Sequence, residues 1–193
     1  MRPMIRRSPR AFAIGAAVLL ALLAATGALA APPEPDPGLE RSVKAAFVYK
    51  FLDYVEWPPA EFVDAQSPFV IGILGSDAMV AELSRLATNR TVAGRPVEIR
   101  GIKRGDPLSS LHVVFVARNE AAQLPPVARL AQAEHVLLVT EVDTAAPPGA
   151  MINLVNVDGR IRFDVALEPA EKAGIRLSSR LLAVARVVKG GGE

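Results

Sequence analysis

The chain has 193 residues, contains no cysteine, and carries 22 Lys and Arg residues against 20 Asp and Glu residues. Without cysteine it can neither form a disulfide nor be acylated as a lipoprotein. Four of the arginines lie before residue 31, so the remainder is slightly acidic, with 18 basic and 20 acidic side chains. This balance provides no basic surface of the kind that binds nucleic acid or anionic lipid.

The first 30 residues have the pattern of a secretory signal peptide. Four arginines precede an apolar run over residues 11–25, and Ala28 and Ala30 form a small-residue cleavage site. The apolar run is shorter than the roughly 20 residues that span a bilayer, which favours cleavage over an uncleaved anchor. We therefore predict a secreted mature protein that begins at Ala31 and does not insert into the membrane.

Residues 31–39 are rich in proline. Proline interrupts helices and cannot donate to a β-ladder, so we expect an extended, mobile arm here. A single domain is expected from residue 40 to residue 189, followed by a flexible glycine-rich tail over residues 190–193.

The domain opens with a predicted amphipathic helix that ends before Pro58 and Pro59. Charged residues such as Lys44 fall away from its apolar stripe. Trp57, the only tryptophan, stands at the end of this segment, either in the core or facing a partner. The stripe comprises Val43, Ala46, Phe47, Phe51, Tyr54 and Val55.

Strands and helices alternate from Phe69 onward. Apolar strands that do not alternate with polar residues, separated by helices, indicate a largely parallel sheet buried on both faces. The strands are predicted at 69–74, 96–100, 111–117 and 136–140, and the helices at 77–87 and 127–133.

The C-terminal part predicts a hairpin. Residues 151–157 and 160–167 are strand-like and are joined by Asp158-Gly159, which suits a type I′ turn. A short helix follows over residues 168–173, and a last helix begins at Ser178. The fold class is therefore α/β: a three-layer sandwich with a largely parallel sheet and a C-terminal antiparallel hairpin, in a single domain.

The last helix supplies a candidate partner interface. Its core-facing stripe comprises Leu177, Leu181, Val184, Ala185 and Val188, whereas Leu182 and Arg186 lie off that stripe. We assign Leu182, Arg186, Arg180 and Trp57 to the interface and expect changes at Leu182 and Arg186 to spare stability. The alternative is that a loop covers Leu182.

A weak candidate anion site lies where a strand gives way to a helix, at Ser76 and Asp77. Ser76 equally suits a helix N-cap, and neither G-x-G-x-x-G nor a Walker sequence surrounds it. His112 and His135 are the only histidines, fewer than the three or four ligands of a zinc site. No G-x-S-x-G or S-x-x-K motif is present. We therefore predict no catalytic residue, metal or cofactor, and a hydrolase is the weakest alternative.

Three stretches resemble the YfiR/HmsC-like family. They are residues 43–51 continuing into Val-Glu-Trp-Pro at 55–58, residues 70–75 with Gly-Arg-Pro-Val at 94–97, and residues 149–188. The resemblance implies a non-enzymatic periplasmic repressor that binds the periplasmic domain of a membrane diguanylate cyclase. Such a repressor would lower cyclic-di-GMP and biofilm formation. The resemblance also implies a homodimer.

Related domains also serve as extracytoplasmic sensors of signalling proteins. A small-ligand-binding sensor module for another membrane signalling protein is therefore the alternative function. Relatives often carry a cysteine beside the position of His112, where this chain has Leu111. A redox mechanism based on that cysteine is closed to this chain.

Overall fold

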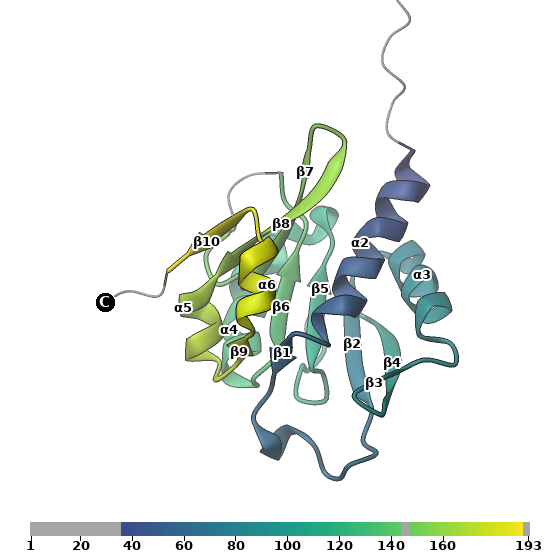
Figure 1. The fold of residues 1–193 in the computed structure, drawn as a ribbon, viewed down its shortest axis with the longest axis vertical. Helices are drawn as coiled ribbons and strands as arrows, with labels where there is room; N and C mark the ends of the chain where they lie inside the picture. The colour runs from purple at the N-terminus through teal and green to yellow at the C-terminus, as the bar shows by residue number, and fades with distance from the viewer. Residues whose placement is uncertain (1–35, 144–146, 191–193) are drawn as a thin grey trace, which may run out of the picture. The chain divides into compact units, whose positions relative to one another are not determined.

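The structure is a computed structural model that describes residues 36–143 and 147–190 (Figure 1). The predicted signal peptide, the mature start at Ala31 and the arm up to residue 35 lie outside the described residues. So does the predicted tail from residue 191.

Helix α2 (Pro37–Phe51) begins inside the predicted arm. Asp36 caps it, because its side chain accepts a hydrogen bond of 2.8 Å from the backbone N–H of Gly38. Pro37 occupies the first turn, where a backbone N–H would have no intrahelical partner. The prediction of an extended arm is therefore wrong for residues 37–39.

The centre of the fold is an eight-stranded sheet in the order β10-β8-β7-β6-β5-β2-β4-β3. Its five central strands, from β7 to β4, run parallel to one another, which confirms the largely parallel sheet. Strands β2, β5 and β6 are buried along their whole length, as their unbroken apolar runs predict. These five strands are β2 (Phe69–Leu74), β4 (Arg95–Ile102), β5 (Val113–Val116), β6 (Leu137–Thr140) and β7 (Ile152–Val157).

The predicted hairpin is also confirmed. Strand β8 (Arg160–Ala166) pairs antiparallel with β7, and Asp158 and Gly159 have φ angles of 50° and 75° at the turn. Beyond β8 lies an edge strand that the sequence did not predict, β10 (Val187–Lys189), which runs parallel to β8. At the opposite edge β3 (Thr91–Val92) pairs antiparallel with β4.

Helices cover both faces of the sheet, which gives the predicted three layers (Figure 1). The larger core joins one sheet face to α2, to α3 (Asp77–Ala87) and to α6 (Ser179–Val184). The smaller core joins the other face to α4 (Leu124–Ala133). The remaining elements are the pair β1 (Val55–Glu56) and β9 (Arg176–Leu177), helix α5 (Leu167–Lys172), and the 3₁₀ turns η2 (Pro59–Glu61) and η3 (Arg118–Gln123).

Across residues 36–143 and 147–190, no helix combines the length and the apolar character that crossing a membrane requires.

Candidate functional site

Trp57 does not belong to a surface. It is 8% exposed, and its indole N–H donates a 3.0 Å hydrogen bond to the backbone carbonyl of His112. Its ring packs against Phe69 with centroids 5.4 Å apart. The core interpretation therefore holds for Trp57, and the partner interface loses this residue.

The last helix is shorter than predicted. Ala185 leaves the helical conformation with ψ at 144°, and the backbone N–H of Arg186 then donates to the carbonyl of Phe163. The chain thereby continues as a strand along the open edge of β8. The predicted stripe is correct for Leu181, which is buried, but wrong for Val184, which is 66% exposed, and for Val188, which lies in β10.

Arg186 forms a bidentate pair with Asp164. Its Nε and one terminal nitrogen lie 2.8 Å and 2.5 Å from the two carboxylate oxygens, and Asp164 is buried. The hydrogen bond from Arg186 to this carboxylate raises the pKa of Arg186. Removing the arginine would leave a buried charge without this partner, so this pair leads us to expect that changes at Arg186 lower stability, in place of the expectation that they spare it.

The other two interface residues remain at the surface of α6. Leu182 is half-buried and packs against the larger core, whereas Arg180 is exposed. Leu182 therefore resembles a covered residue more than an exposed contact residue.

At the predicted anion site, Ser76 acts as the N-cap of helix α3. The Ser76 hydroxyl accepts a 3.2 Å hydrogen bond from the backbone N–H of Met79, which is the N-cap interpretation. A hollow of about 600 Å³ adjoins Ser76 and Asp77, and its Arg104 is paired with Glu120 at 2.7 Å. The structure thus confirms that Ser76 caps α3, and anion binding at Ser76 and Asp77 stays a prediction.

A different surface stands out: an apolar groove along α2, here called the α2 groove. It consists of two adjoining hollows of about 400 Å³ and 420 Å³ that share Val43 and Phe47. Helix α2 forms one wall, and the β7–β8 hairpin with α6 forms the other. The apolar residues that line it are Leu39, Val43, Ala46, Phe47, Phe51, Tyr54, Ile161, Phe163, Leu181 and Val184.

The groove exists because α2 is apolar on two sides. Ala45 and Val48 face the core and are fully buried, whereas Ala46 and Leu39 are exposed, Leu39 by 64%. The predicted stripe through Val43, Ala46 and Phe47 thus lines the groove instead of forming the main core contact. Helical periodicity in the sequence predicts one apolar stripe, and it does not distinguish the core-facing side of α2 from the groove-facing side.

Aromatic rings form the floor of the α2 groove. Phe163 of β8 contacts Phe47 and Phe51 of α2 edge-to-face, with centroid distances of 5.6 Å and 5.3 Å. Such contacts add to the stability gained from burial and fix the ring positions. The two walls are therefore joined through well-packed aromatic side chains.

A buried charge cluster holds α2 in place beside the groove. Lys44, which lies off the predicted apolar stripe, is only 5% exposed and lies 2.5 Å from Glu40 and 2.6 Å from Glu141. The hydrogen bond from Lys44 is the main cause that lowers the pKa of Glu40, which also accepts from Asn156 at 2.9 Å. These contacts tie α2 to the end of β6 and to the hairpin.

The two histidines make separate backbone contacts. Nδ1 of His112 accepts from the N–H of Val70 at 3.1 Å, and Nδ1 of His135 lies 2.7 Å from the carbonyl of Ala173. In the part of the chain that the structure describes, no three His, Asp or Glu side chains are grouped as metal ligands.

The sequence model of the YfiR/HmsC-like family matches residues 41–186 of this chain. The chain belongs to the YfiR/HmsC-like family. Members are periplasmic regulators in the cyclic-di-GMP pathway and are regulatory, not catalytic. No curated protein matches the chain. The matched range contains most of α2, the β7–β8 hairpin and α6, and so contains nearly all of both walls of the α2 groove.

Proposed function

We propose that this YfiR/HmsC-like chain binds the periplasmic domain of an inner-membrane diguanylate cyclase and holds the enzyme inactive. The consequence is less cyclic-di-GMP and less biofilm. The observation that carries the proposal is the family match over residues 41–186, which spans most of the chain. In this proposal the chain itself catalyses nothing.

The α2 groove is the surface we assign to the cyclase. Interfaces are held together mainly by a few aromatic and apolar side chains in a desolvated centre, surrounded by a polar rim. The groove offers the aromatic side chains of Phe47 and Tyr54, and Lys50 also lines it. An amphipathic helix that inserts apolar residues every three or four positions fits such a surface.

The test combines cellular and purified measurements. Deleting the gene should raise cyclic-di-GMP, and the purified protein should bind the periplasmic domain of the cyclase encoded beside it. Leu39→Asp and Val184→Asp place a charge on exposed residues of the groove, so binding should weaken at least about tenfold while folding is kept.

Val63→Asp is the matched control, because Val63 is 96% exposed and lies outside the α2 groove. If Val63→Asp weakens binding as much as the groove variants do, the groove is not the interface. If deletion leaves cyclic-di-GMP unchanged, the repressor function itself is wrong.

We further propose that the protein is a homodimer, as the family resemblance suggests. Light scattering coupled to size-exclusion chromatography measures the mass directly. A monomer at micromolar concentration would contradict this.

The alternative function is a small-ligand-binding sensor for another membrane signalling protein. A polar hollow beside Lys172 and Lys189 favours it. A histidine kinase encoded beside this gene, in place of a cyclase, would support the sensor over the repressor.

A further inference from the structure

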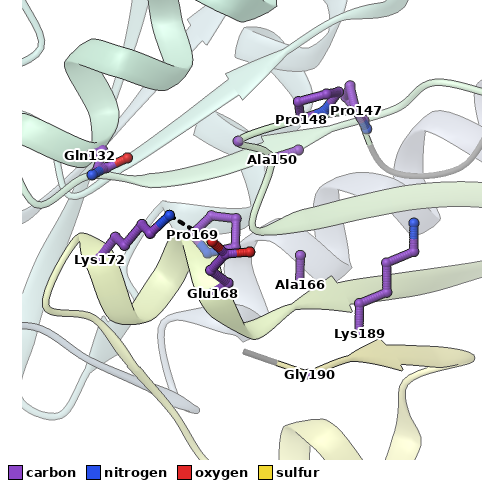
Figure 2. A pocket seen from close by; sticks show the side chains of 11 residues that line it. Gln132, Pro147, Pro148, Ala150, Ala166, Glu168, Pro169, Lys172, Lys189 and Gly190 are labelled. Carbon is purple, nitrogen blue, oxygen red and sulfur yellow. Dashed lines mark hydrogen bonds and ion pairs between the residues drawn. The ribbon is translucent and has the colours of Figure 1, made fainter. Parts of the chain in front are cut away.

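A second surface hollow lies away from the α2 groove, between α4, the loop 147–150, α5 and the end of β10. Its volume is about 520 Å³, within the range of roughly 300–1,000 Å³ typical of small-molecule sites. Figure 2 shows Lys172 and Lys189 on opposite sides of this hollow, with Gln132 above them. Three hydrogen-bond donors from three separate elements therefore surround one cavity.

We propose that this hollow, here called the lysine hollow, binds a small anion that carries a carboxylate or phosphate group. The proposal does not depend on the cyclase, because none of the residues that line the lysine hollow lines the α2 groove.

The charge of the lysine hollow favours an anion. Lys172 is held by Glu168 at 2.6 Å, as the dashed line in Figure 2 marks. Lys189 makes no ion pair with any residue that the structure describes. Two lysines and one glutamate thus line the hollow, so among the described residues it carries one positive charge in excess. Carboxylate and phosphate groups carry several acceptor oxygens, which suit lining donors of this kind: two lysine ammonium groups and the Gln132 amide.

Small and rigid residues keep the lysine hollow open. Two alanines and three prolines are among its lining residues: Ala150, Ala166, Pro147, Pro148 and Pro169. Proline has a fixed φ angle, so these prolines lose little conformational freedom when a ligand binds.

Gly149 closes the loop against α4. Its φ angle is 84°, and a Cβ there would lie 2.5 Å from the Cβ of Ala128. A side chain at this position is excluded both by the backbone conformation and by the contact with α4. The loop therefore packs directly on the helix, and no side chain from residue 149 fills the cavity.

The test is a titration of the purified, ¹⁵N-labelled protein with inorganic phosphate and, separately, with succinate at low salt. We expect saturable amide shifts confined to residues of the hollow such as Gly149, Ala150 and Gly190. Lys189→Gln should weaken binding about tenfold, as expected for loss of roughly one charge-assisted hydrogen bond. Lys50→Gln is the control, because Lys50 is an exposed lysine that does not line the lysine hollow.

The two probes distinguish the ligand source: saturation by phosphate alone indicates a phosphoryl ligand, and saturation by succinate alone indicates a carboxylate. Shifts spread over exposed lysines throughout the protein would overturn the proposal, as would equal losses in Lys189→Gln and Lys50→Gln. The absence of saturation with either probe would overturn it as well.

Discussion

His112 is a histidine buried among aromatic rings. Phe62 stacks on it at 4.6 Å between centroids, and Trp57 and Phe69 meet it edge-on at 6.0 Å and 5.4 Å. Because the Val70 N–H donates to Nδ1, the neutral ring carries its proton on Nε2. A proton on Nδ1 of His112 would point at the N–H of Val70, so two donors would face each other and this hydrogen bond would be lost. Burial, assisted by the nearby charge of Arg95, lowers the pKa of His112 to about 4.

This depressed pKa predicts a loss of stability in acid. The unfolded chain binds the proton near pH 6.5, whereas folded His112 binds it near pH 4. The stabilisation is therefore complete above pH 6.5 and declines as the pH falls towards 4, by at most about 3 kcal/mol. Urea unfolding between pH 7.5 and pH 4 measures it, and the fluorescence of Trp57 reports the local change.

His112→Asn is the matched variant, since its amide oxygen can still accept from Val70 but does not titrate. His135→Asn controls for loss of a histidine elsewhere. If His112→Asn loses as much stability between pH 6.5 and pH 4 as the unaltered protein does, another group is responsible for the acid sensitivity.

Among the elements, the central strands and α3 follow from local sequence, whereas the start of α2 and the C-terminal segment do not. Strand β2 and helix α3 have the predicted bounds, because an unbroken apolar run and a Ser76 cap each specify one structure. The segment after Leu181 has helical spacing, yet Val187 and Val188 join the edge of β8. β-Branched residues favour strands, but only the open sheet edge, a tertiary feature, decides between the two.

Strand β10 should depend on the pair between Arg186 and Asp164. Arg186→Leu leaves the buried carboxylate unpaired, so the unfolding midpoint should fall and amide hydrogen exchange over 187–189 should accelerate. Arg180→Leu is the control, because Arg180 is an exposed arginine on α6. The double variant Asp164→Asn, Arg186→Leu should recover part of the loss, since it removes the buried charge. Equal midpoints for Arg186→Leu and Arg180→Leu would contradict this role.

For the molecule as a whole, the three-layer α/β architecture was predictable but the surface that we assign to the partner was not. The alternation of apolar strands with helices specifies the layers. The α2 groove arises only when the second apolar side of α2 meets Phe163 and α6, which are more than a hundred residues away in the chain. Helical geometry alone singles out Leu182, and neither Leu182 nor Arg180 is among the residues that line this groove.

Leu181 and Val184 separate stability from binding within one short helix. Leu181 is 3% exposed and belongs to the larger core, whereas the side chain of Val184 lines the α2 groove from an exposed position. Leu181→Ala should lower the free energy of unfolding by about 2–5 kcal/mol, because burial is lost and a cavity remains. Val184→Ala should change it by roughly 0.5 kcal/mol or less.

The functional consequences should then diverge. Cells that express Leu181→Ala should lose repression because the folded protein is depleted, since the cost is a large share of a domain's roughly 5–15 kcal/mol stability. Val184→Ala should keep its abundance yet bind the cyclase domain more weakly, because it removes apolar contact at the groove. Thermal melts, immunoblots of the periplasmic fraction and pull-downs with the cyclase domain together test both variants. Full binding by Val184→Ala at normal abundance would place the partner elsewhere than the α2 groove.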